Sequence, residues 1–152
     1  MTQTTSGVSQ SCAKVEFSAG CSVYTDISGS VQSVTGLEQE RMTGEAYTFD
    51  GDFAIVKGGK KQPLTVTFNI VYTAEATEAY ELARGEFETT GCGGTCCVKY
   101  YPAGGGIGTQ EKLITGILKR FAYPPADASA GGPVMASFDI YASSVITSTV
   151  VS

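Results

Sequence analysis

Histidine is absent from the 152 residues of this chain, and so is tryptophan. Histidine is the commonest general base and the commonest side-chain metal ligand, so its absence excludes Ser-His-Asp and Cys-His catalysis. A Ser-Lys pair or a pair of carboxylates remains conceivable. Asp50 and Asp52 come nearest to such a pair, but they flank Gly51, and Asp-Gly-Asp is typical of a hairpin turn. We therefore expect a protein that is not an enzyme and that binds no cofactor.

Charge is scarce, and positive charge most of all. Charged residues make up 16% of the chain, and 15 acidic residues outnumber 10 basic ones, which gives a formal net charge of −5. The densest basic group is Lys57, Lys60 and Lys61. Proteins that grip nucleic acid need clustered cations to neutralise phosphates, so this composition argues against a nucleic-acid-binding function.

Long hydrophobic runs are also missing. The apolar stretches are short and interrupted by polar residues, well below the roughly 18 residues needed to cross a bilayer. The first residues do not combine a positive segment with an apolar one, as a secretory signal would. We therefore expect no membrane binding by this chain, and synthesis in a reducing cytosol, where structural disulfides are uncommon.

The cysteines form one unusual pattern, CGGTCC at 92–97. The complete set is Cys12, Cys21, Cys92, Cys96 and Cys97. A Cys-x3-Cys-Cys segment beside two distant cysteines is a weak zinc signal, because zinc knuckles carry paired Cys-x2-Cys motifs. We expect no metal; a disulfide that closes this loop and buried free thiols both stay open. Adjacent cysteines in a strand should point to opposite faces.

Short β-like segments separated by glycine are abundant. With 42% hydrophobic residues the chain can enclose one core, so we expect a single domain at 12–142. Polar arms without a face to bury flank it at 1–11 and 143–152. Residues 36–62 should form a long projecting hairpin or loop, with strands at 45–49 and 53–56. The other expected strands are 13–17, 21–27, 30–34, 64–72, 96–101, 112–123 and 134–142.

One segment, 74–89, has helical rather than strand periodicity. Apolar residues recur there at spacings of three and four, with acidic residues on the opposite side. These apolar residues are Ala76, Ala79, Tyr80, Ala83 and Phe87. Thr73 could cap the start of the helix. The order of elements predicts a mainly β fold, a β-sandwich or partly closed barrel with one flanking α-helix, a projecting hairpin and extended terminal arms.

The two faces of segment 64–72 are the clearest in the chain. Leu64, Val66, Phe68, Ile70 and Tyr72 alternate with Thr65, Thr67 and Asn69. Because successive side chains of a strand point to opposite faces, the first set should enter the core and the second should leave it. We expect Phe138 and Ile140 to pack against the buried set, together with Tyr80, Ala83 and Phe87 of the helix.

Several segments together resemble the tail tube proteins, or major tail proteins, of long-tailed bacteriophages. They are VYTDISGSVQSV, GLEQERMTGEAYTFDGD, KGGKKQPLTVTFNIVYT and PVMASFDIYA. The likeness is one of order and character and extends over roughly 23–142. The cysteines at 92–97 are not part of it.

This resemblance implies a β-sandwich protomer that forms hexameric rings, which stack into a tube for the passage of double-stranded DNA. It also implies tape-measure, tail-terminator and distal tail proteins as partners. The location would be the virion tail, after assembly in the host cytoplasm. An acidic wall suits such a channel, since it repels phosphate.

Two sets of site residues follow from this interpretation. Contacts between rings are expected from the hairpin, at Arg41, Glu45, Asp50, Asp52, Lys60 and Lys61. The alternative is a mobile, solvated hairpin. The polar face of 64–72, with Thr65, Thr67 and Asn69, would line the lumen; the alternative is ordinary outward exposure. Lys119 or Arg120 could also lie on the channel wall, but segment 112–123 is apolar on both faces and does not show which of them would.

Two other functions remain open. Another self-assembling virion component, such as a tail terminator, a decoration protein or a capsid accessory protein, would share the same assembly logic. A β-sandwich binding module would share the strand pattern, but a signal peptide and an even set of disulfides would be expected with it.

Overall fold

The computed structural model describes residues 2–89, 91 and 94–151. The elements in chain order are η1 (Gln10–Cys12), β1 (Lys14–Ser18), β2 (Thr25–Asp26), β3 (Val31–Thr35), β4 (Arg41–Ala46), β5 (Ile55–Lys61), β6 (Leu64–Val71), α1 (Ala79–Phe87), β7 (Thr95–Tyr101), β8 (Gln110–Ala122) and β9 (Met135–Thr149).

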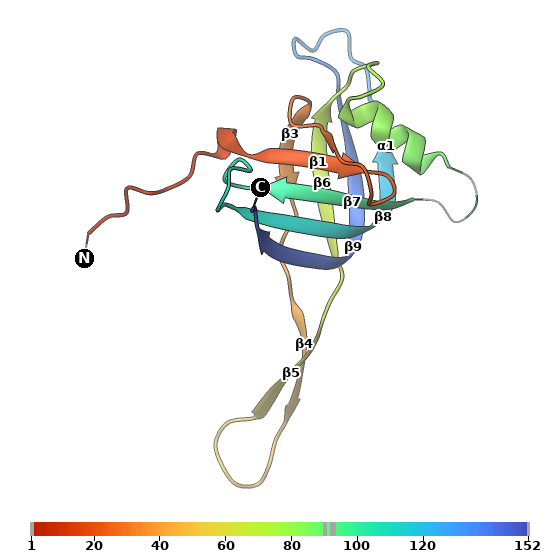
Figure 1. The fold of residues 1–152 in the computed structure, drawn as a ribbon. Coiled ribbons are helices and arrows are strands. Elements are labelled where there is room, and N and C mark those ends of the chain that lie inside the picture. The colour runs from red at the N-terminus through yellow and green to blue at the C-terminus, as the bar shows by residue number, and fades with distance from the viewer. Residues whose placement is uncertain (1, 90, 92–93, 152) are drawn as a thin grey trace.

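Seven of these strands form one antiparallel sheet, in the order β2-β1-β7-β8-β9-β6-β3. The long strands β8 and β9 pair with each other along most of their length. In addition, β7 pairs with the first half of β8, and β6 pairs with the first half of β9. Strands β1 and β7 cross β6 at a large angle, so the sheet curls into a half-barrel (Figure 1). The predicted fold, mainly β with a partly closed barrel, one helix and a projecting hairpin, is confirmed.

A glycine marks the place where the curl begins. The register of β8 and β9 shifts between Thr115 and Gly116. A Cβ atom on Gly116 would lie 2.2 Å from the carbonyl oxygen of Tyr141. Only glycine permits so close an approach of two backbones, which a sharply curled sheet requires.

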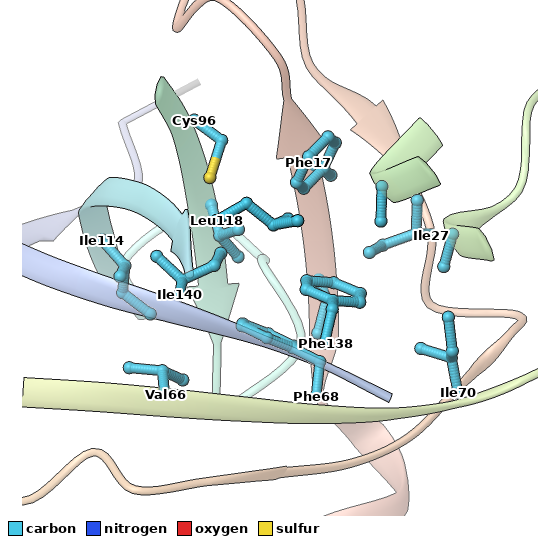
Figure 2. Packing of buried hydrophobic residues seen from close by; sticks show 14 of the residues in the cluster. Phe17, Ile27, Val66, Phe68, Ile70, Cys96, Ile114, Leu118, Phe138 and Ile140 are labelled. Carbon is cyan, nitrogen blue, oxygen red and sulfur yellow. The ribbon is translucent and has the colours of Figure 1, made fainter. Parts of the chain in front are cut away.

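The core fills the concave side of the half-barrel (Figure 2). Phe68 of β6 stacks on Phe138 of β9 with ring centroids 5.0 Å apart, and Phe17 of β1 meets Phe138 edge-on at 6.1 Å. Leu64, Val66, Phe68 and Ile70 are buried, as are Phe138 and Ile140, whereas Tyr72, just beyond the end of β6, is exposed. The prediction of which face of β6 enters the core is therefore confirmed.

The helix is shorter than predicted. Residues 75–78 form a turn instead, and Glu78, with an extended backbone, precedes α1 as its N-cap residue. Thr73 does not cap the helix; its hydroxyl donates to the Glu78 carboxylate. Tyr80 and Ala83 are buried as expected, whereas Phe87 is half-exposed and stacks on Phe121 of β8.

Three strand predictions were misplaced. Segment 21–27 contributes only the two residues of β2, because Cys21 has a left-handed backbone, with φ at 59°, which interrupts an extended strand. The hairpin strands expected at 45–49 and 53–56 lie farther from the turn, at β4 and β5. The loop between them, 47–54, is too long for a tight turn to set the register.

The C-terminal segment 143–152 is not an unpaired arm. Strand β9 continues to Thr149, and its second half pairs with residues 110–115 of β8. The strand propensity of this segment was visible in the sequence, but its partner, which lies about thirty residues earlier in the chain, was not. The N-terminal residues 2–9 have no regular structure and extend away from the half-barrel (Figure 1).

Candidate functional site

The hairpin β4–β5 is separate from the half-barrel. Its two strands form a sheet of their own, and each of their residues is exposed. In Figure 1 the hairpin extends well beyond the end of the half-barrel opposite α1. An isolated two-stranded ribbon is only marginally stable in water. This geometry leaves the whole hairpin available to another molecule.

Apolar side chains concentrate on this hairpin and its tip. They are Met42, Tyr47, Phe49, Phe53, Ile55 and Val56. Phe49 is fully exposed, and Phe53 is 91% exposed. Monomeric proteins rarely leave such a group of large apolar side chains in water, and their presence marks an interaction surface. The six residues are called the apolar hairpin surface below.

The six charged residues predicted for contacts between rings also lie on this hairpin and are exposed. Arg41 donates a hydrogen bond to the carbonyl oxygen of Gly59 at 3.1 Å, across the ribbon. Within the part of the chain that the structure describes, none of the six takes part in a salt bridge. The sequence reasoning emphasised these charges and missed the apolar side chains. The signal was present in the segment YTFDGDF, whose aromatic residues have no place in a solvated turn.

The polar residues Thr65, Thr67 and Asn69 lie on the convex side of β6 and are partly buried. Their register partners on β9 are Tyr141, Asp139 and Ser137, respectively. The side-chain amide of Asn69 donates to the hydroxyl of Ser33 on β3, at 2.9 Å. These residues thus form a continuous polar band across β3, β6 and β9.

Two cations of β8, Lys119 and Arg120, join the same band. The guanidinium of Arg120 forms two hydrogen bonds with the carboxylate of Asp139, Nε to Oδ2 at 2.7 Å and Nη2 to Oδ1 at 3.1 Å. The ammonium of Lys119 lies 5.0 Å from the ring centroid of Tyr141. The hydrogen bond from Arg120 lowers the pKa of Asp139, so this carboxyl stays ionised at neutral pH.

A second polar group lies on the part of the sheet formed by β1, β7 and the first half of β8. Lys14 and Glu16 form an ion pair at 2.8 Å, and the hydroxyl of Tyr101 donates to Glu16 at 3.2 Å. Lys99 pairs with Glu111 at 3.7 Å. Burial is the first cause of the raised pKa of Tyr101, which stays protonated at neutral pH. No catalytic acid and base emerge from this group, because its charges neutralise one another.

Of the two alternatives that the sequence left open, buried free thiols hold for Cys96, whereas the disulfide is formed elsewhere than expected. Cys97 forms a disulfide with Cys21, which joins β7 to the loop after β1 instead of closing the loop at 92–97. Cys96 points to the core as a free thiol, and burial raises its pKa to about 12. The free Cys12 is exposed, and Cys92 lies outside the described residues. Among the described residues, no three His, Cys, Asp or Glu side chains come together as a metal site.

The open side of the half-barrel carries a groove of about 580 Å³ between the N-terminal segment and β3. Its lining includes Val8, Val15, Val34 and Tyr100 but no charged residue. Strand β3 is also an outer strand of the seven-stranded sheet, so its far edge has no partner strand among the residues that the structure describes. An unpaired strand edge can accept a further strand. The one helix of the described chain that exceeds a single turn, α1, is too short to cross a membrane.

The comparisons with known proteins identify the fold. No model of a protein family matches this sequence, and no curated protein matches it either. Solved structures do match it. A chain of the tube-terminating cap of the anti-feeding prophage (AFP) is 13% identical, with a TM-score of 0.73 over 98% of this chain and 95% of that one.

Two more structures show the same fold. A chain of the sheath–tube complex of the extracellular contractile injection system PVC is 15% identical, with a TM-score of 0.71 over 96% of this chain and 94% of that one. A chain from the tail of an empty GTA particle is 12% identical, with a TM-score of 0.62 over 94% and 98%. The protein therefore has the fold found in chains of phage-like tail and injection assemblies.

Proposed function

We propose that this chain is a structural subunit of a phage-like tail tube, which assembles with copies of itself into stacked hexameric rings. The observation that carries the proposal is the apolar hairpin surface, held out in solvent by a fold that recurs in tail assemblies. Burying one such side chain stabilises a complex by about 1.5–3 kcal/mol, so these six supply a strong reason to associate.

The shape of the molecule favours an open-ended assembly. The hairpin projects from one end of the half-barrel (Figure 1). In a stack of copies we expect it to contact a different surface of the next copy, and not the next copy's hairpin. A contact between two different surfaces repeats from copy to copy, which makes rings or extended polymers instead of closed dimers. We assign the hairpin to the contact between successive rings, with its apolar side chains in the centre and the six charged residues around them.

The two outer strands of the sheet favour contacts within a ring. Strand β3 ends the sheet on one side and the short strand β2 on the other. Copies placed side by side could join these edges, and six copies would close a ring with a continuous wall. The sixfold symmetry stated for the AFP baseplate and for the GTA tail supports the choice of six.

In this arrangement the polar band of β6 faces the channel, and double-stranded DNA passes along it. Thr65, Thr67 and Asn69 are small and neutral, and the chain as a whole carries a formal charge of −5. Such a wall offers phosphate groups no strong partner. The protein acts by shape and assembly, without catalysis, in a tail particle put together in the host cytoplasm. Tape-measure, terminator and distal tail proteins would bind the ends and interior of the tube.

A tail terminator is the second candidate. The AFP cap and the PVC sheath/tube terminator have the same fold as this chain. A terminator would form a single ring and stop there, because only one of its two ring faces accepts another copy.

Electron microscopy of the purified full chain tests the proposal. We expect the wild type to form long tubes, whereas the double variant Phe49→Ser and Phe53→Ser should form single rings or subunits. The matched control is Val23→Ser with Ile107→Ser, since both residues are also highly exposed but lie outside the hairpin. The control should form tubes like the wild type. Single rings from the wild type would indicate a terminator, and monomers under all conditions would refute assembly.

A further inference from the structure

A β-bulge in β8 places two successive cations on one face of the sheet. Leu118 is paired with Ile140, and Arg120 with the next residue, Asp139, so Lys119 is the extra residue of the bulge. Leu118 and Phe121 both enter the core, while Lys119 and Arg120 are both exposed on the convex side. In a regular strand two neighbours would point to opposite faces. The bulge therefore concentrates positive charge on the polar band.

Two nitrogens of Arg120, Nε and Nη2, form hydrogen bonds with its neighbours on β9. Besides its two hydrogen bonds with Asp139, its Nη2 donates to the hydroxyl of Ser137 at 3.1 Å. The Asp139 side chain is only 14% exposed, which holds the carboxylate in a fixed position beneath the guanidinium. A phosphate group that approached Arg120 through Nε and Nη2 would have to displace this carboxylate, and the negative charge of Asp139 opposes a phosphate at the remaining donors as well.

Lys119 is engaged differently. Its ammonium lies over the ring of Tyr141, which is the register partner of Thr65 on β6. A cation over an aromatic face is attracted by the ring, but the neutral ring does not cancel its positive charge as the carboxylate of Asp139 does for Arg120. Around these two cations the band offers the neutral side chains of Thr65, Thr67 and Asn69.

We infer that Asp139 is a specificity-determining residue that stops this face from holding a polyanion, with Tyr141 as a weaker second restraint. Lys119 and Arg120 side by side would otherwise make a contact site for the backbone of double-stranded DNA. This use of the face rests on the proposed function, in which DNA must slide past the polar band. In this arrangement Arg120 and Lys119 interact with Asp139 and Tyr141 of the same sheet, which disfavours their contact with phosphate.

The test is DNA binding by purified full-length protein with Asp139→Asn. Asparagine preserves the size of the side chain but removes the charge that binds Arg120. The matched control is Asp127→Asn, which changes net charge equally at a loop carboxylate that bonds only with Ser129. The readout is fluorescence anisotropy of a labelled duplex across a series of salt concentrations.

Asp139→Asn should bind the duplex about tenfold more tightly than the wild type at low salt. The slope of log affinity against log salt should steepen by about 1 to 2, since each phosphate contact contributes about 0.9. Asp127→Asn should match the wild type, and adding Arg120→Gln to Asp139→Asn should restore weak binding. Equal affinity of the two Asp→Asn variants, or tight binding by the wild type itself, would overturn the inference.

A second variant covers the case in which Asp139→Asn does not fold, as judged by circular dichroism. Tyr141→Leu removes the aromatic ring at an exposed position and frees Lys119. It should steepen the salt slope by about 1, and an unchanged slope would then refute the inference. Electron microscopy of the same proteins shows separately whether they form tubes. Altered DNA binding in a protein that never forms tubes would retain the inference about Asp139 and reject the proposed function, whereas tubes with unaltered binding would do the reverse.

Discussion

Strand β6 and the hairpin β4–β5 are both antiparallel β-structure, yet β6 buries its apolar side chains and the hairpin leaves its own exposed. In β6 every second side chain is enclosed by the sheet and by β9 beside it, whereas both hairpin strands are exposed along their whole length. Apolar side chains occur in both. The difference is that β6 packs within the half-barrel, whereas among the described residues the strands of the hairpin pair only with each other. Apolar residues in β6 therefore stabilise the domain, and those in the hairpin are not buried by it.

The largest expected effect comes from truncating one phenylalanine in each region. Phe68→Ala should lower the free energy of unfolding by about 3–5 kcal/mol, because the side chain is fully buried and stacks on Phe138. Phe49→Ala should change it by less than about 0.5 kcal/mol, since its ring is surrounded by solvent. Chemical denaturation of unassembled subunits measures both. Equal losses would show that the hairpin packs on its own domain.

A smaller effect is expected from reducing the disulfide between Cys21 and Cys97. The two cysteines are 76 residues apart and enclose the hairpin in their loop. The cross-link restricts the unfolded chain, so its loss should cost about 2–4 kcal/mol. Thermal unfolding with and without reductant measures this loss. The unfolding temperature of Cys21→Ser should be the same in both conditions, because this variant has no such disulfide to reduce. Because the hairpin carries no cysteine, we expect assembly of folded subunits to survive reduction; loss of tubes without loss of folding would contradict the separation of the two regions.

The smallest effect concerns a glycine in each region. Gly116→Ala forces a methyl group against the backbone of Tyr141 and should destabilise the domain by about 1–3 kcal/mol. Gly44→Ala in β4 meets nothing within 4 Å and should alter the free energy of unfolding by less than about 0.5 kcal/mol. The pair is compared by denaturant titration at equal subunit concentration. A neutral Gly116→Ala would mean that the curl of the sheet does not depend on this close approach.

Local patterns predicted the parts of the fold that depend on neighbouring residues. The alternation in β6 correctly assigned Val66, Phe68 and Ile70 to the core, and helical spacing found α1 to within one or two turns. The same reasoning failed for the second half of β9, whose partner on β8 is far away in sequence. It left the faces of Lys119 and Arg120 open, and the β-bulge that puts both on one face interrupts the alternation from which a face is predicted.

By itself the sequence determined a mainly β chain without histidine chemistry, with one helix, an amphipathic strand at β6 and a long projecting hairpin. These properties follow from composition and from short-range periodicity, which any segment carries alone. Only the tertiary structure decided that Cys21 meets Cys97 and that Lys119 and Arg120 share one face with Asp139. Each of these depends on the register between distant strands, which is set by packing of the whole sheet and by the close approach at Gly116.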